Sequence, residues 1–212
     1  MARYFQWSAL PTGRLREVGI KSFPGGAQTG RSIAALKVLL GIALLADFKS
    51  RKIQTSLSDL EALTGLSRPM VIRGTEFLED EGFIAVKRAH TNEYELLCPE
   101  NDPYWAKLPT DLLRKNLSEL PNRGMAVLAA LKTYVLLISL RPNTSNEIAV
   151  THKRIREETG IQPLHVRRAL DVLFNHALIS VSLSNGDGHE KKWRHNSFTL
   201  LGISIEKTGG KE

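Results

Sequence analysis

The chain has 212 residues, of which 42% are hydrophobic and 24% are charged, and its formal net charge is +7. This composition is ordinary for a soluble globular protein, and the length suits one large domain or two small ones. The single cysteine, Cys98, excludes an intrachain disulfide and a four-thiolate metal site. The basic excess favours a polyanionic partner.

The N-terminal stretch lacks the unbroken apolar core of a signal peptide. The two most apolar runs, IAALKVLLGIALLADF and AVLAALKTYVLLISL, are interrupted by Lys37 and Lys132. Both runs are too short to span a bilayer comfortably. We therefore expect two buried helices in a cytoplasmic protein that has no membrane partner.

The first half predicts an extended segment, a long helix, a strand, two helices and a hairpin. Ser58 is a candidate N-cap, with Glu61 at the spacing of a capping box, and Ser67 is a candidate cap for the next helix. Gly65 stands where a tight turn between helices needs a residue that tolerates positive φ. Trp7, in the extended segment, is expected to anchor the core over the long helix. The predicted helices cover 32–48, 58–64 and 67–81, the strand covers 53–55, and the hairpin pairs 85–88 with 93–97.

The second half repeats the first. A shift of 95 residues places the AALK of 34–37 on the AALK of 129–132, Gly65 on Gly160 and Arg73 on Arg168 without a gap. Further upstream, WSALPTGRL matches WAKLPTDLL, so Trp105 is expected to act as Trp7 does. The repeated elements are helices at 124–140, 152–159 and 162–176, a strand at 148–150, and a hairpin of 179–184 with 197–201. We infer two domains, 1–98 and 99–212, joined near CPENDP.

The stretch LSDLEALTGLSRPMVIRGTEFLEDEGFI, residues 57–84, resembles the core of the winged helix–turn–helix family. LEDEGFI and LFNHALI are similar to that family's junction between helix and wing. The resemblance implies a mainly α fold with small β-hairpins (α+β), arranged as two tandem winged helix–turn–helix domains.

Winged helices of this kind place the second helix of the turn in the DNA major groove, and basic side chains around it meet phosphates. Arg73 and Arg168 lie on the expected outward face, although ion pairs with Glu76 and Asp171 are the alternative. Trp193 has two alternatives, contact with DNA or packing on its own wing. The candidate DNA-binding residues are Arg68, Arg73, Lys87, Arg88, Lys153, Arg154, His165, Arg167, Arg168, Lys191, Lys192, Trp193 and Arg194.

No catalytic triad, phosphate-cradling loop, metal-ligand cluster or small-molecule motif stands out, so we expect no enzyme activity, cofactor or metal. The tandem layout, with an LPT lead-in before each long helix, looks like plasmid and phage replication initiators. This resemblance implies binding of double-stranded DNA at origin repeats, with a homodimer or further replication proteins as additional candidate partners. One alternative is a transcriptional repressor of the same fold. The other is a winged-helix protein-interaction subunit of a chromosome-condensation-type complex.

Overall fold

The computed structural model describes residues 7–99, 104–142, 144–183 and 196–203. Within these residues the chain is a mixed α+β protein whose strands form small antiparallel sheets. The predicted class, mainly α with small hairpins, is confirmed.

The first half contains the predicted order of helix, strand, two helices and hairpin. Strands β2 and β3 both pair with β4, so the hairpin and the earlier strand form one sheet in the order β2-β4-β3. The elements are β1 (Trp7–Pro11), α1 (Gly13–Glu17), η1 (Ile20–Ser22), η2 (Gly26–Gln28), α2 (Thr29–Leu45), β2 (Lys52–Thr55), α3 (Leu57–Thr64), α4 (Arg68–Asp80), β3 (Ile84–Lys87) and β4 (Asn92–Leu96).

The second half repeats this order, and its sheet has the equivalent topology, β6-β8-β7. Its elements are β5 (Trp105–Pro109), α5 (Thr110–Leu117), α6 (Met125–Leu140), β6 (Glu147–Val150), α7 (His152–Thr159), α8 (Pro163–Asn175), β7 (Ile179–Leu183) and β8 (Asn196–Leu200). The shift of 95 residues carries α3 onto α7 and α4 onto α8 without a gap. The internal repeat inferred from the sequence is therefore present in the structure.

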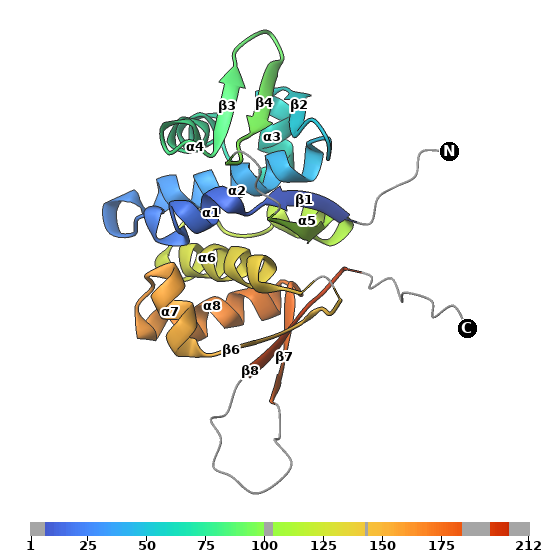
Figure 1. Cartoon of the computed structure of the whole chain (residues 1–212). Coiled ribbons are helices and arrows are strands. Elements are labelled where there is room, and N and C mark those ends of the chain that lie inside the picture. The colour runs from blue at the N-terminus through green and yellow to red at the C-terminus, as the bar shows by residue number, and fades with distance from the viewer. Residues whose placement is uncertain (1–6, 100–103, 143, 184–195, 204–212) are drawn as a thin grey trace, which may run out of the picture.

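The two halves pack together through equivalent surfaces. Strands β1 and β5 are antiparallel, with Trp7 opposite Pro109 and Pro11 opposite Trp105. Helices α2 and α6 contact each other beside this pair. Figure 1 shows them stacked in the middle of the molecule, with α3 and α4 beyond α2 and with α7 and α8 beyond α6. Each half thus uses the same elements to contact the other, as the two subunits do in a two-fold symmetric homodimer, but here within one chain.

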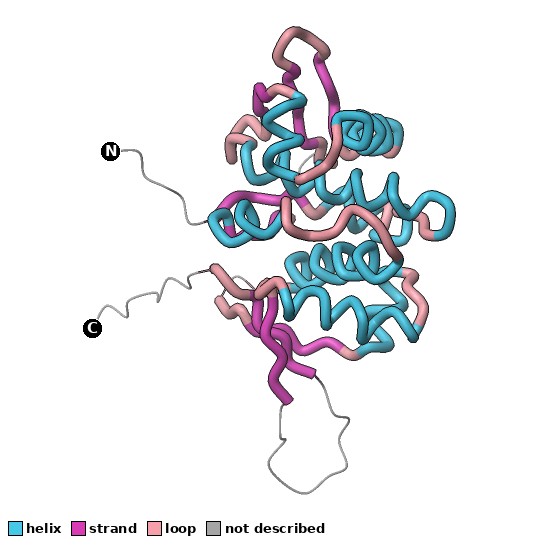
Figure 2. Tube along the Cα trace, turned by 180° about the vertical axis from the view of Figure 1, so that it is seen from behind, coloured by secondary structure: helices cyan, strands magenta, loops and turns pink. Residues whose placement is uncertain are grey.

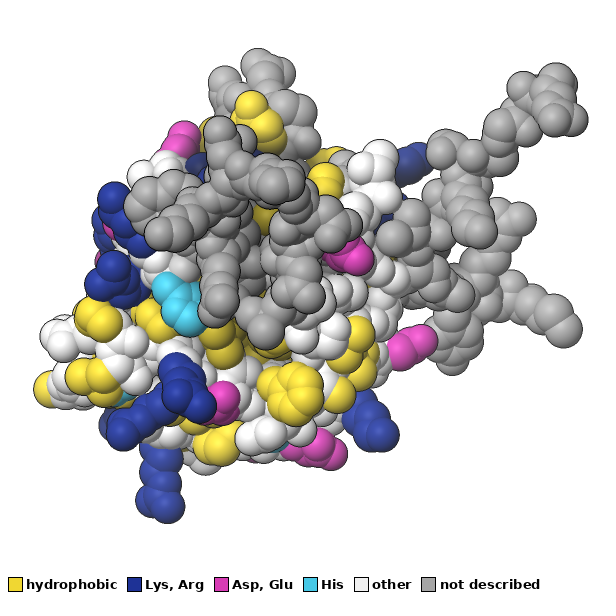
Figure 3. All heavy atoms as spheres, turned by 90° about the horizontal axis from the view of Figure 1, so that it is seen from below, with side chains coloured by type: hydrophobic (Ala, Val, Ile, Leu, Met, Phe, Trp, Pro, Cys, Tyr) yellow, Lys and Arg dark blue, Asp and Glu magenta, His cyan; other side chains and the backbone are white. Residues whose placement is uncertain are grey.

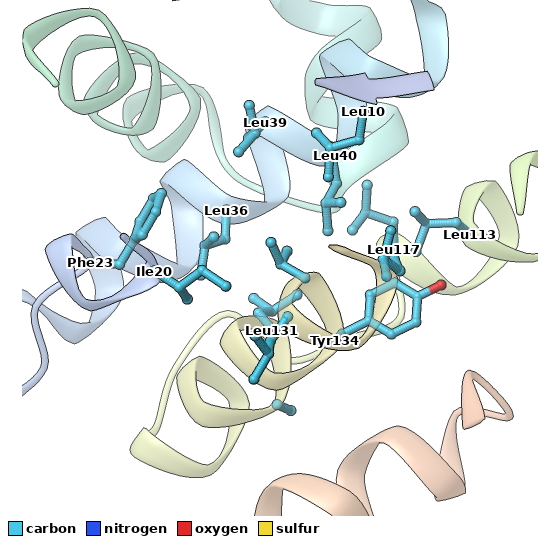
Figure 4. Close-up of a cluster of buried hydrophobic side chains, with 14 of the residues drawn as sticks. Leu10, Ile20, Phe23, Leu36, Leu39, Leu40, Leu113, Leu117, Leu131 and Tyr134 are labelled. Atoms are coloured by element: carbon cyan, nitrogen blue, oxygen red, sulfur yellow. The ribbon is translucent and has the colours of Figure 1, made fainter. Parts of the chain in front are cut away.

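Burial from both sides explains why α2 and α6 are apolar all round. A helix that faces the core in every direction has no polar stripe, and both helices are buried along most of their length. Figure 4 shows Leu36 of α2 near Leu131 of α6, with Leu113 and Leu117 of α5 beside Tyr134. One continuous cluster of buried apolar residues thus joins the predicted domains 1–98 and 99–212. The rear view in Figure 2 shows the same layering of helices around this centre.

The helical stretch Gly26–Leu45 is long and apolar enough to cross a membrane, but 72% of its most apolar window is buried inside the molecule. This stretch is the central helix of the first half. The described residues therefore do not indicate a membrane protein.

The predicted role of Trp7 and Trp105 as core anchors is corrected by the structure. Both side chains are only half-buried. Their rings stack on each other at 5.2 Å between centroids, and the ring of Phe48 meets both nearly edge-on. The two tryptophans therefore join the halves on one face of the β1–β5 pair.

Lys37 lies in the buried face of α2, and its ammonium group links the halves. Its Nζ donates hydrogen bonds to the Thr64 carbonyl at 2.8 Å, to the Leu120 carbonyl at 2.6 Å and to Asn122 Oδ1 at 2.7 Å. Leu120 and Asn122 belong to the segment that enters α6, so the interaction crosses from one half to the other.

Lys132 occupies the equivalent position in α6 and makes the reciprocal contact. Its Nζ donates to the Phe23 carbonyl at 3.1 Å, in the segment that enters α2. Burial lowers the pKa of both Lys37 and Lys132 to about 8, because removing an ammonium from water disfavours its charged form.

This burial predicts that stability rises with pH. Above pH 8 the folded protein loses the Lys132 proton, whereas the unfolded chain keeps it until its ordinary pKa of 10.5. The unfolded state then binds more protons, so the free energy of unfolding increases through this window. We expect Lys132→Met to reduce the gain between pH 7.5 and 9.5 by about 1–2 kcal/mol, measured by urea unfolding. Equal pH slopes for the variant and the wild type would contradict this. Tyr134, whose pKa is raised by burial, does not contribute to this change in the free energy of unfolding, because tyrosines titrate above this pH range.

Candidate nucleic-acid interface

The helix–turn–helix segments of the two halves are built in the same way. Helix α3 ends at Thr64 and α7 at Thr159, and each is followed by a left-handed glycine, Gly65 with φ 66° and Gly160 with φ 68°. In each turn the threonine Oγ1 accepts a hydrogen bond from the backbone N–H two residues on, at 3.3 and 3.4 Å. The predicted turn glycines are confirmed.

The predicted cap of the first short helix is wrong by two residues. Ser56 caps α3, and Asp59 completes the capping box, in place of Ser58 and Glu61. Ser67 does occupy the N-cap position of α4, but its side chain makes no capping hydrogen bond. Ser56 takes the N-cap position because β2 ends at Thr55, so the backbone turns into the helix immediately after the strand.

Helix α8 presents a basic and apolar outer face. Arg167 and Arg168 are exposed, and Leu164, in the first turn, is 57% exposed. Neither arginine forms an ion pair with any residue that the structure describes. The alternative pairing of Arg168 with Asp171 is therefore not seen, and both guanidinium groups are available.

The bracing helix α7 adds cations that are held weakly. Lys153 Nζ lies 3.8 Å from Glu157 Oε1, and Arg154 Nε lies 3.9 Å from Glu158 Oε1. Exposed pairs of this kind contribute about 0.3–0.5 kcal/mol. A phosphate could therefore replace either glutamate at low cost.

The first half holds two of its candidate arginines in ion pairs. Arg88 and Glu79 form a two-point interaction at 3.1 and 2.6 Å, and the Arg88 side chain lowers the pKa of that carboxyl. Arg68 Nη1 lies 3.5 Å from Glu61 Oε1. Acidic residues of the first half thus partly neutralise the positive charge of its own candidate DNA-binding face.

Arg73 and Lys87 complete the candidates of the first half. Both are exposed, and neither has an ion pair within the described part of the chain. The pairing of Arg73 with Glu76 is not seen there either. However, α4 ends in acidic residues, and Asp80 pairs with Arg31 at 3.2 Å. Phosphate would meet more negative charge here than on α8.

His165 departs from the prediction that it points outward. Its side chain is half-buried, and Nδ1 is buried with no hydrogen-bond partner among the residues that the structure describes. The residue lies one position before Val166, which is buried in the core. Its ring consequently leans towards the protein instead of standing free as Arg167 and Arg168 do.

The wing of the second half was predicted to contribute further contacts. Lys191, Lys192, Trp193 and Arg194 all lie outside the described residues. Their role stays a prediction.

Exposed apolar residues on the second half were not predicted from the sequence. Phe174 is 58% exposed and Val181 on β7 is 43% exposed. In Figure 3, which views this half from below, apolar and Lys or Arg side chains lie next to one another. The exposure of Phe174 could have been predicted from the repeat, because Phe174 corresponds in the first half to Glu79, a charged residue that forms an ion pair.

Within the described ranges, no group of three His, Cys, Asp or Glu side chains could hold a metal ion. Neither the protein-family models nor the curated proteins contain a match to this chain.

Proposed function

We propose that this chain is a double-stranded DNA-binding protein made of two winged helices, with α8 as its main recognition helix. The observation that carries the proposal is the outer face of α8, where Arg167 and Arg168 stand exposed without an acidic partner in the described structure. Arginine can pair with guanine edges in the major groove, and an apolar side chain such as Leu164 can meet a thymine methyl.

The position of these residues on the helix supports the proposal. Recognition helices contact bases with their N-terminal residues, while the preceding helix crosses the backbone. Leu164, Arg167 and Arg168 fall in the first two turns of α8. Lys153 and Arg154 begin the bracing helix α7, where phosphates would lie.

The biological role we propose is plasmid or phage replication initiation at origin repeats, in the cytoplasm and without enzymatic activity. The DNA-contacting surface would be the same in a transcriptional repressor. The exposed Phe174 and Val181 suit the alternative of a protein-contact module. Selecting bound sequences from a random library and locating them beside an origin or a promoter separates the first two roles.

The first test is salt dependence. If about six phosphates are neutralised, the affinity of the full-length protein for duplex DNA should fall roughly a thousandfold between 50 and 200 mM salt. Fluorescence anisotropy with a labelled random duplex measures this. A flat response would instead favour the protein-contact module.

A matched pair of variants tests the choice of helix. Arg168→Ala should weaken binding of the preferred sequence by about 1–3 kcal/mol and relax the preference at one base. Arg73→Ala, at the equivalent position of α4, should have a smaller effect because of the acidic residues around it. The variants are made in the whole chain because the two halves share one core. A larger loss from Arg73→Ala would mean that α4 is the main recognition helix.

A further inference from the structure

A cavity of about 470 Å³ lies between the two halves, away from the proposed DNA surface. One wall is formed by β1, the end of α2 and the turn that follows it, and the other by the start of α5. Its volume falls in the usual range of small-molecule sites. None of its wall elements belongs to a helix–turn–helix, so the cavity does not follow from the proposed function.

The inner wall is apolar and aromatic, with a small polar floor. Trp7 and Phe48 line it, with their rings 5.8 Å apart and nearly perpendicular. On the floor, the Ser8 hydroxyl donates to the Leu44 carbonyl at 3.2 Å and lies 3.0 Å from Thr110 Oγ1. Such a corner suits a planar ring, and the hydroxyl groups offer it a few polar contacts.

The charged residues at the rim favour an acidic ligand. Arg114 makes a single long hydrogen bond, 3.5 Å from Nη2 to the Leu44 carbonyl, and neither it nor Lys49 has an ion pair among the described residues. A guanidinium fork matches a carboxylate or a similar oxyanion.

The two carboxylates of the lining, Asp47 and Asp111, are each stabilised by their own surroundings. Asp47 Oδ1 already accepts hydrogen bonds from the backbone N–H groups of Lys49 and Ser50 and from the Ser50 hydroxyl, which lower the pKa of Asp47. Asp111 lies in the first turn of α5, where the helix dipole favours a negative charge. The charge of Lys49 also lowers the pKa of Asp47, so Arg114 is the cation left for a ligand.

We infer that this cavity is a binding site for a small planar aromatic acid. The ring would pack against Phe48 and the part of the Trp7 ring that Trp105 and the Lys107 ammonium leave uncovered, and its acidic group would meet Arg114. Because the walls come from both halves, a bound ligand would brace the joint between them. Ligand binding in this cavity does not require DNA binding.

The probe is anilinonaphthalene sulfonate, a planar aromatic anion whose fluorescence rises on burial. The full-length protein should bind it saturably, and naphthoate should displace it better than the uncharged naphthylmethanol. Arg114→Gln, a change at an exposed side chain, should weaken binding roughly tenfold. Asp111→Asn should leave binding equal or tighter, and Phe174→Ser should leave it unchanged because that patch lies elsewhere.

Ala46→Phe, which fills part of the cavity, should abolish binding while the circular dichroism spectrum stays that of the folded protein. If this variant does not fold, Arg114→Gln still tests whether the ligand binds in this cavity. Binding that survives Arg114→Gln unchanged, is lost with Phe174→Ser, or prefers naphthylmethylammonium to naphthoate would overturn the assignment.

Discussion

Replacing Gly65 with alanine is expected to lower the free energy of unfolding by about 2–5 kcal/mol. Gly65 has φ +66°, a left-handed conformation that costs a residue with a Cβ about 1–2 kcal/mol. A Cβ there would also lie 2.9 Å from Ser118 Cα and closer still to the Ser118 carbonyl oxygen. Since both are backbone atoms of the other half, neither can move aside cheaply. Urea unfolding monitored by circular dichroism measures the loss.

Gly160 provides the matched control. Its φ is +68°, so the conformational cost is the same, but an added Cβ would meet only the flexible side chain of Lys21, at 3.3 Å. Gly160→Ala should therefore cost about 1–2 kcal/mol. If the two alanine variants were equally stable, the close approach of Ser118 to the first turn would be wrong.

Lys37→Met is expected to cost about 2–4 kcal/mol, although it removes a buried charge. The methionine fills similar space, but the Thr64 carbonyl, the Leu120 carbonyl and Asn122 Oδ1 all lose their donor. Each buried acceptor left unpaired costs about 1–3 kcal/mol, and removing the desolvated ammonium offsets part of that. Equilibrium unfolding at pH 7 measures the difference.

Lys132→Met is the corresponding control at the same pH. It leaves one hydrogen bond at 3.1 Å unmade, so its cost should stay within about 1 kcal/mol. A Lys37→Met variant as stable as Lys132→Met would show that the three acceptors find other donors. We expect Lys37→Met to cost more than Lys132→Met also because Asn122 donates to the Gly65 carbonyl at 2.6 Å and so connects Lys37 to the turn.

The sequence predicted the elements well because each carries its own local signal. Strand, helix and turn positions repeat between the halves, and Gly65 and Gly160 mark the turns by a conformation that other residues resist. The cap was missed because Ser56 and Ser58 both fit the local pattern. Only the end of β2 at Thr55 decides between them.

The details of the candidate site depend on contacts that sequence spacing cannot show. Arg88, just after the end of β3, meets Glu79 nine residues earlier on α4, and that pairing depends on the angle at which β3 follows α4. The half-burial of His165 depends on the packing of α8. The cavity could not be predicted for the same reason, since Arg114 of the second half approaches Trp7 and Phe48 of the first half only when the two halves pack together.

The reciprocal interface has an evolutionary consequence. In a true homodimer every substitution appears twice, so a change that suits one subunit is imposed on the other. Here one chain carries both copies, and each can mutate alone. The halves already differ on their outer surfaces, where Glu79 of the first half corresponds in the repeat to the exposed Phe174 of the second. Meanwhile Lys37 and Lys132 keep the shared centre alike. Such a chain can change its two outer faces separately while its interior stays symmetric.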